Sequence, residues 1–143
     1  MDYIYPGLFQ QEADGGYLVT FPDVPEAITQ GDDLADAMAS ASDALGLALR
    51  GYLVDGKSLP VPSKRLRGHI DVPVEAANAL KLAVVEAFRA AGISKSEFAR
   101  RLGKADTEAH RILDPDHPTK ISMLEAALRL LGKQVVVSVK DAA

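Results

Sequence analysis

Three polar side chains in one short stretch of the chain have the chemistry needed to recognise DNA bases. Arg111 can donate two hydrogen bonds to the acceptors of a guanine, Thr107 can contact a phosphate or a thymine methyl group, and His110 can serve either purpose. Further hydrogen-bond donors fall near the ends of the expected helices, where they suit phosphate groups: Lys95, Ser96, Lys104 and Lys120. Together these residues form the predicted DNA-binding site.

Acidic side chains in the same stretch oppose that interpretation. Asp106, Glu108 and Asp114 lie among the predicted contacts and would repel phosphates. The alternative is a helical unit that serves only as a dimerisation domain.

Helical spacing of apolar residues positions the predicted contacts. An apolar stripe over residues 75–91 stops at Gly92, and Ser94 with Glu97 has the spacing of a capping box, in which each side chain satisfies a backbone group of the first turn. Gly103 then supplies a turn before a third helix. This spacing predicts a helix-turn-helix whose last helix presents the three polar side chains to a major groove.

The end of the chain predicts self-association. A helix is expected over residues 121–131, and the β-branched run VVVSV within residues 134–140 predicts a terminal strand. An exposed strand needs a partner, and pairing with its own copy across a two-fold axis would supply one. We therefore expect a homodimer or a dimer of dimers, which would present two recognition helices to a palindromic site.

The N-terminal half predicts a small sheet covered by one helix. Strands over residues 3–10 and 17–21 flank the turn residues Asp14, Gly15 and Gly16, and a third strand covers residues 27–30. Pro6 removes one hydrogen-bond donor, which suggests an edge or bulged first strand. Apolar residues then recur at helical spacing from Leu34 to Tyr52, after the predicted N-cap Asp33, with Gly56 past the end.

A composition change divides the chain into two domains of an α+β protein. Residues 58–68 combine two prolines with three basic residues and read as a linker, and residues 69–74 read as one more strand. This predicts a first domain over residues 1–63, or to residue 74 if that strand is included, and an all-helical second domain with a terminal strand over residues 75–143.

Net charge differs in sign between the two halves. Residues 1–63 hold 2 basic and 10 acidic side chains, for a net charge of -8, whereas residues 64–143 hold 14 and 10, for +4. The acidic half would attract a basic partner, and the basic half would attract nucleic acid.

Several other kinds of chemistry are not indicated. The chain contains no cysteine, its N-terminus lacks the pattern of a signal peptide, and no apolar run approaches the roughly 20 residues of a membrane span, so we expect a cytoplasmic protein without membrane contact. His69, His110 and His117 do not share a helical metal-binding spacing. We find no phosphate-binding glycine loop or nucleophile elbow, and we expect no metal or cofactor.

Three parts of the chain together carry a resemblance to a known family: YLVTFPDVPEAITQGDDLADAMASASDAL, the PVPS linker, and GISKSEFARRLG followed by HRILDPDH and LEAALRLLG. In these parts the chain resembles HicB antitoxins with an appended DNA-binding domain. The resemblance covers nearly the whole chain. Its most specific parts are TFPDVPEAITQGD and the succession of sheet domain, proline linker and helix-turn-helix.

This resemblance implies a fold, a partner and a function. It implies an N-terminal fold resembling a degenerate ribonuclease H, binding to a small HicA toxin that cleaves messenger RNA, and repression of the shared operon. The toxin contacts are expected in a loop braced by prolines, because an ordered loop recognises a partner at low entropic cost. The predicted toxin-binding residues are Phe21, Pro22, Asp23 and Glu26.

The resemblance does not imply an enzyme. Ribonuclease H chemistry needs several carboxylates that converge on two metal ions, whereas the acids of this chain are assigned to turns, a helix cap and a loop. Two other interpretations stay open: a stand-alone repressor whose N-terminal domain senses a small ligand, and a metal-dependent ribonuclease.

Overall fold

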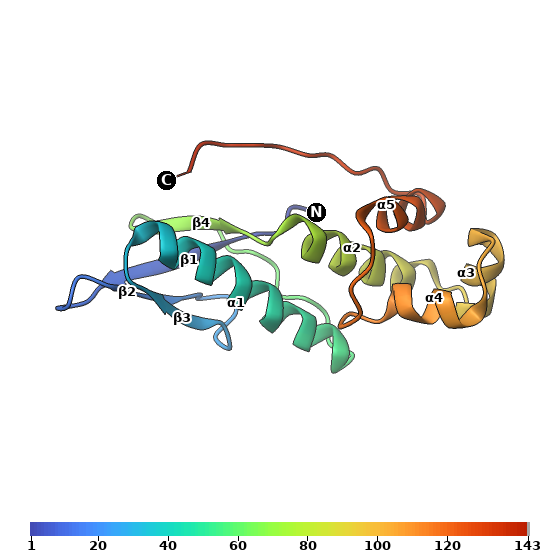
Figure 1. Ribbon diagram of the computed structural model, residues 1–143, viewed down its shortest axis with the longest axis horizontal. Helices are drawn as coiled ribbons and strands as arrows, with labels where there is room; N and C mark the ends of the chain where they lie inside the picture. Colours follow the sequence, from blue (N-terminus) through green and yellow to red (C-terminus); the bar gives the residue numbers. More distant parts are fainter. Residues whose placement is uncertain (143) are drawn as a thin grey trace. The chain divides into compact units, whose positions relative to one another are not determined.

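The structure is a computed structural model that describes residues 1–142 and divides into two compact units. The first unit, Met1–Glu75, holds a sheet and one helix, and the second, from Ala76 on, holds only helices (Figure 1). The predicted α+β class is therefore confirmed. The division lies beyond the strand expected at residues 69–74, so this strand belongs to the first unit.

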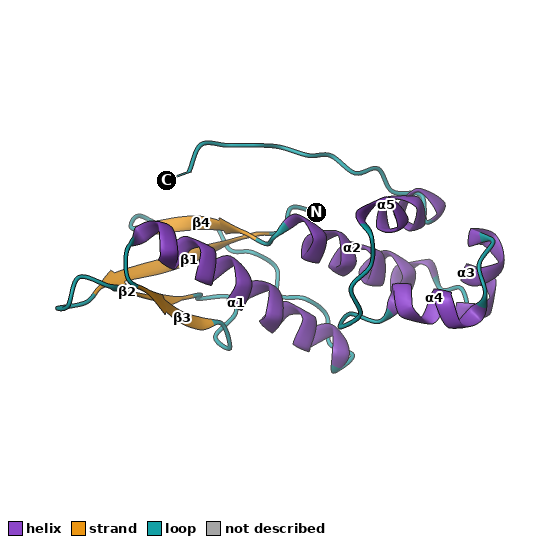
Figure 2. Ribbon diagram, in the orientation of Figure 1, coloured by secondary structure: helices purple, strands orange, loops and turns teal. Residues whose placement is uncertain are grey.

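The first unit is a four-stranded antiparallel sheet with a long helix across one face (Figure 2). Its sheet order is β3-β2-β1-β4, and the helix α1 is 21 residues long. Val19, Leu45 and Val72 are among the fully buried residues that fill the space between sheet and helix. The bounds are β1 (Ile4–Gln11), β2 (Tyr17–Thr20), β3 (Ile28–Gly31), α1 (Leu34–Val54) and β4 (His69–Pro73).

Strand β1 lies in the middle of the sheet. The prediction that Pro6 marks an edge strand is therefore wrong. Strand β4 pairs with Ile4 to Leu8, and β2 pairs with Leu8 to Gln11. The two partners are offset along β1, and β2 begins to pair only after Pro6. A proline that lacks its N–H is thus tolerated in a central strand, because at its position the ladder runs on one side.

The segment that reads as a linker connects α1 to β4 within the first unit. The Tyr5 hydroxyl donates a hydrogen bond of 2.7 Å to the backbone oxygen of Pro60. The backbone N–H of Ser63 donates to Oδ2 of Asp23 at 2.8 Å, and its hydroxyl donates to Oδ1 of the same carboxylate. These bonds hold the segment against the first unit at Pro60 and Ser63.

The second unit packs four helices around one apolar core. Phe98 is fully buried, and its ring meets that of Phe88 edge to face at a centroid distance of 5.5 Å. Among the described residues, no helix of either unit is both long and apolar enough to cross a membrane. The helices are α2 (Ala76–Ala91), α3 (Lys95–Leu102), α4 (Asp106–Leu113) and α5 (Ile121–Leu130).

The terminal strand expected over residues 134–140 is not formed in the single chain. Residues 133–142 have neither helical nor strand structure, and the side chains of Val136, Val137 and Val139 are 88%, 80% and 92% exposed. The β-branched sequence favours an extended backbone, but a strand also requires a second strand to complete its hydrogen bonds. The described part of this unit offers helices only.

Candidate partner and nucleic-acid interfaces

The loop after β2 consists of two turns whose apolar residues point into the first unit. The N–H of Val24 donates to the oxygen of Phe21 at 3.2 Å, and that of Ala27 donates to the oxygen of Val24 at 2.9 Å. Phe21 is only 2% exposed, and Val24 and Ala27 are also buried. Pro22 and Glu26 are exposed, so they form the outer surface of this loop.

Two carboxylates fix the loop to neighbouring elements. Asp23 accepts the two hydrogen bonds from Ser63, and the Tyr52 hydroxyl of α1 lies 2.6 and 2.9 Å from the two carboxylate oxygens of Glu26. The bond from Tyr52 lowers the pKa of Glu26, and the same bond raises the pKa of Tyr52. The predicted toxin contacts therefore divide into a buried anchor, Phe21, a braced half-buried residue, Asp23, and two exposed residues.

An acidic hollow of about 240 Å³ lies between the β1–β2 turn and the start of α1. Its wall includes the carboxylates of Glu12, Asp14, Asp32 and Asp36. Strand pairing brings these residues together, because Tyr17 at the start of β2 lies opposite Gly31 at the end of β3. The whole unit, residues 1–75, carries 12 acidic and 5 basic side chains, a net charge of -7.

Sequence reasoning did not bring these acids together and missed the hollow. Asp14 accepts the N–H of Gly16 at 3.0 Å, as expected for its turn, and Asp33, which does not line the hollow, caps α1 by accepting the N–H of Asp36 at 2.8 Å. The pairing register between β2 and β3 brings the β1–β2 turn close to the start of α1. This register depends on residues that are far apart in the sequence, so no local sequence pattern predicts it.

The predicted DNA contacts all lie on the surface of the second unit. All but Lys120 belong to two helices and the three-residue turn that joins them, in which Gly103 has a left-handed backbone with φ of 71°. Small Ala99 of α3 is buried close to this turn, where it accepts the N–H of Lys104 at its backbone oxygen. Lys95 and Ser96 lie in the first turn of α3, Lys104 in the turn, Thr107, His110 and Arg111 on α4, and Lys120 directly before α5.

Acidic neighbours moderate the charge of this surface. The ammonium of Lys104 lies 3.9 Å from a carboxylate oxygen of Glu108, one helical turn along. Asp106 occupies the first turn of α4, where its charge favours the helix but opposes a phosphate. A bound phosphate would therefore compete with Glu108 for Lys104.

The expected capping box at the start of α3 is only half formed. Ser94 accepts the N–H of Glu97 at 3.0 Å, as predicted. The carboxylate of Glu97 instead pairs with Arg100 and Arg101, whose hydrogen bonds lower the pKa of Glu97 to about 2. Sequence reasoning missed these two exposed arginines, although the i, i+3 and i, i+4 spacing to Glu97 was visible.

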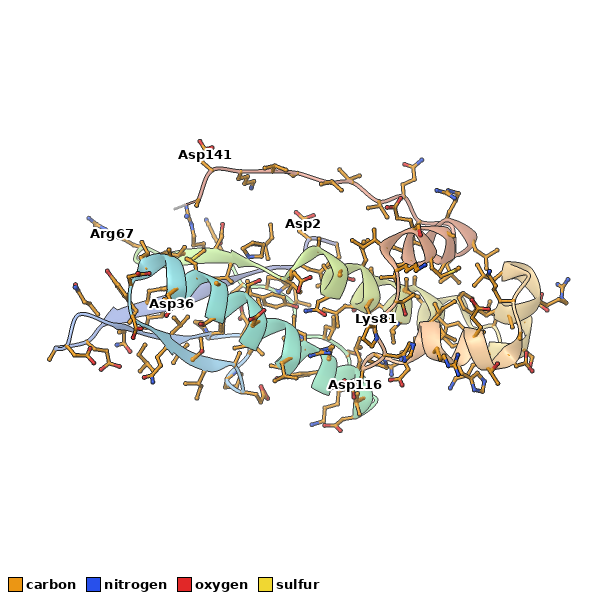
Figure 3. All side chains as sticks on the ribbon, in the orientation of Figure 1. Asp2, Asp36, Arg67, Lys81, Asp116 and Asp141 are labelled. Atoms are coloured by element: carbon orange, nitrogen blue, oxygen red, sulfur yellow. The ribbon has the colours of Figure 1, made fainter. Side chains whose placement is uncertain are left out.

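A buried lysine in the second unit was also missed. Lys81 of α2 is only 4% exposed, and its ammonium donates to the oxygens of Arg111, Ile112 and Thr119 (Figure 3). Burial lowers the pKa of Lys81 to about 8, and the charge of Asp114 acts in the opposite direction. The sequence shows Lys81 only as an ordinary cation beside an apolar stripe, because its acceptors come from a distant segment.

No group of three or more histidine, aspartate or glutamate side chains in the described residues is arranged to hold a metal ion. The carboxylates of the acidic hollow therefore form no such group either.

The family model and the similar proteins that comparison with known proteins finds all belong to one family. Residues 4–83 match the family described as HicB-like antitoxin of bacterial toxin-antitoxin systems. The chain is 40% identical over 134 residues to antitoxin HicB of Escherichia coli (strain K12), covering 92% of this chain and 95% of that protein. It is 35% identical over 136 residues to antitoxin HicB 1 of Photorhabdus laumondii, covering 95% and 86%, and 31% identical over 132 residues to antitoxin HicB of Pseudomonas fluorescens, covering 92% and 90%.

Proposed function

The chain belongs to the HicB-like antitoxins of bacterial toxin-antitoxin systems, and from this premise we propose that it neutralises a HicA-type, mRNA-cleaving toxin and represses its own operon. The first unit binds the toxin, and the second binds operator DNA. The protein acts in the cytoplasm and has no catalytic role.

The charge and the rigidity of the first unit support the toxin-binding role. A toxin that binds RNA needs a basic surface, and a unit with a net charge of -7 complements it. The loop of Phe21, Pro22, Asp23 and Glu26 is held by hydrogen bonds from Ser63 and Tyr52, so little order is lost on binding. In this proposal Pro22 and Glu26 make the outward contacts, and Phe21 fixes the loop from within.

The helix pair α3 and α4 supports the DNA-binding role, and this observation carries the proposal. The three-residue turn, the buried Ala99 and the left-handed Gly103 have the features of a helix-turn-helix, with α4 as its recognition helix. The side chains that α4 exposes include Thr107, His110 and Arg111. Lys95, Ser96, Lys104 and Lys120 lie near helix ends, where phosphate contacts are expected.

Two copies of the chain would complete the operator-binding form. A recognition helix of eight residues contacts one half-site, so a palindromic operator requires two. The exposed valines of residues 135–139 are the proposed contact between copies, in a homodimer or a dimer of dimers.

The antitoxin proposal expects a gene for a short basic protein beside that of this chain, and co-expression of the two proteins tests the toxin-binding role. Tagged full-length chain should capture that protein, and so should a fragment of residues 1–75. A fragment of residues 1–63 should fail, because it lacks β4, whose five residues pair with β1. If the full chain captures no such protein yet binds its own promoter DNA, the protein is a stand-alone repressor, and the ligand-sensing alternative gains support.

A further inference from the structure

The end of α4 differs from the ends of the other helices. The last carbonyls of a helix need donors from outside it, and a glycine with a left-handed backbone commonly supplies them. Among the described residues, α1, α2, α3 and α5 are each followed by such a glycine: Gly56, Gly92, Gly103 and Gly132. Helix α4 is followed by Asp114 and Pro115 instead.

The consequence of a glycine end is visible in three of these helices. The residue after the glycine donates its N–H to the carbonyl five positions back, as Lys104 does to Ala99 at 3.0 Å and Lys133 does to Leu128 at 2.9 Å. At the end of α4, Asp114 donates to Arg111 at 3.3 Å, but Pro115 has no N–H to give. The chain after α4 therefore cannot complete the cap by itself.

Lys81 supplies the missing donors from another helix. Its Nζ lies 2.8 Å from the oxygen of Ile112, 3.1 Å from that of Arg111 and 2.6 Å from Oγ1 of Thr119. An ammonium has three N–H bonds, so all three are used. The positive charge also suits the C-terminal end of a helix, where the peptide dipoles leave partial negative charge.

Burying a lysine costs desolvation free energy, and the hydrogen bonds of Lys81 offset this cost. An apolar side chain at this position would cost less desolvation but would leave two helix-end carbonyls and a hydroxyl without this donor. The ammonium ties the end of α4 to α2 and to the segment that leads into α5. Its bond to the carbonyl of Arg111 acts on the backbone of the residue proposed to contact guanine.

We infer that Lys81 is the C-terminal cap of α4, supplied from α2, and that it is a positioning residue for operator recognition. The first part rests on the geometry alone, and the second rests on the proposed function. Lys81 is buried and touches no DNA in this role. It fixes the backbone from which Arg111 extends.

The test compares two variants on the same helix. Lys81→Met keeps the length of the apolar stem and removes all three donors, whereas Val84→Ala weakens the core of the unit and leaves those three donors in place. Each full-length variant is titrated with a duplex from the chain's own promoter and with a scrambled duplex of equal length. Lys81→Met should lower affinity for the promoter duplex about tenfold and affinity for the scrambled duplex less than about twofold, because phosphate contacts persist. Val84→Ala should leave the ratio of the two affinities unchanged.

Amide hydrogen exchange of the free protein tests the cap without DNA. Lys81→Met should speed exchange in the second half of α4 more than in α3, whereas Val84→Ala should speed exchange in both. If Lys81→Met folds poorly, Thr119→Val replaces it as the test, because it removes one acceptor of the ammonium and keeps the shape of the side chain. This variant should also speed exchange in the second half of α4, but by less. Unchanged exchange in α4 would overturn the cap. Faster exchange with an unchanged affinity ratio would overturn the positioning role, whereas a wild-type chain that does not prefer its promoter duplex would overturn the operator proposal itself.

Discussion

Arg111 and Lys104 differ in the part of DNA that each is proposed to contact. Arg111→Ala removes a bidentate guanine contact, so it should cost roughly 1 to 3 kcal/mol per half-site and relax sequence preference. Lys104→Ala removes a phosphate contact and should weaken binding to all sequences alike. The measurement is a titration of each variant against the promoter duplex and against a scrambled duplex.

The same two variants test whether the two functions are separate. Both side chains are exposed and belong to the second unit, so melting temperature and toxin affinity should stay near wild type. If Arg111→Ala binds the promoter duplex as well as wild type, α4 is not the recognition helix. A loss of toxin neutralisation with intact DNA binding would contradict the division of labour.

The buried ammonium of Lys81 predicts a stability that rises at alkaline pH. Its pKa is about 8 in the folded chain and near the ordinary 10.5 in the unfolded chain. Between these two values the unfolded chain binds more protons, so the free energy of unfolding increases with pH. Relative to Lys81→Met, wild type should gain on the order of 1 to 3 kcal/mol between pH 7 and pH 10.

Urea unfolding of wild type and Lys81→Met at both pH values provides the measurement. The difference between the two proteins isolates Lys81, because every other titrating group, including Tyr52 with its raised pKa, is common to both. A difference that does not change with pH would show that the ammonium keeps its ordinary pKa when folded.

Several elements follow directly from local sequence patterns, and the register between them does not. Asp33 and Ser94 were predicted as N-caps, and both accept the expected backbone N–H. Hairpin, helices and the left-handed turn at Gly103 likewise arise from residues that are neighbours in the chain. The offset pairing that accommodates Pro6 depends on β4, which is distant in sequence, so it could not be predicted.

The candidate sites divide in the same way. Exposure of Arg111 and the other predicted DNA contacts follows from helical periodicity. The partners of Asp23 and Glu26, by contrast, come from other segments, Ser63 and Tyr52, and no spacing in the sequence reports them. The strand at residues 134–140 was predicted from β-branched residues alone, and a single chain gives it no partner.

Gly31 controls the approach of α1 to the end of β3. A Cβ atom at this position would lie 2.4 Å from the backbone nitrogen of Ala37 and 2.5 Å from its Cα. Gly31→Ala must therefore displace the first turn of α1 and should destabilise the protein by about 1 to 3 kcal/mol.

Gly51 is the matched control, because it lies on the exposed side of α1, and an added Cβ there would have no atom within 4 Å other than the local backbone of its own helix. Gly51→Ala should stabilise the helix by about 0.5 to 1 kcal/mol. Thermal unfolding followed by circular dichroism compares the two. A stabilising Gly31→Ala would show that the start of α1 is free to move away from β3.

The sequence of the C-terminal segment suits antiparallel pairing with a second copy in one register. Centring the pair on Val137 places Val135 opposite Val139 and Lys133 opposite Asp141. One face of the pair is then formed by valines with opposite charges at each end. If one strand slides by one residue relative to the other, Lys133 lies opposite Lys140, and two like charges then face each other, which is unfavourable.

Charge exchange tests both the assembly and its register in the whole protein. Asp141→Lys places like charges opposite each other at both ends of the proposed pair, so it should weaken the dimer, whereas adding Lys133→Asp should restore it by reversing the pair. Each opposite-charge pair contributes roughly 0.2 to 1 kcal/mol, and symmetry doubles the effect, so the dissociation constant should rise several-fold and then recover. Val137→Asp, which places two carboxylates side by side at the two-fold axis, should separate the copies more completely.

Light scattering over a concentration series measures the mass of each variant, and promoter binding should weaken in parallel because a monomer presents one recognition helix. A wild-type chain that is monomeric at micromolar concentration would contradict the pairing, and dimers unaffected by both Asp141→Lys and Val137→Asp would place the contact between copies outside this segment.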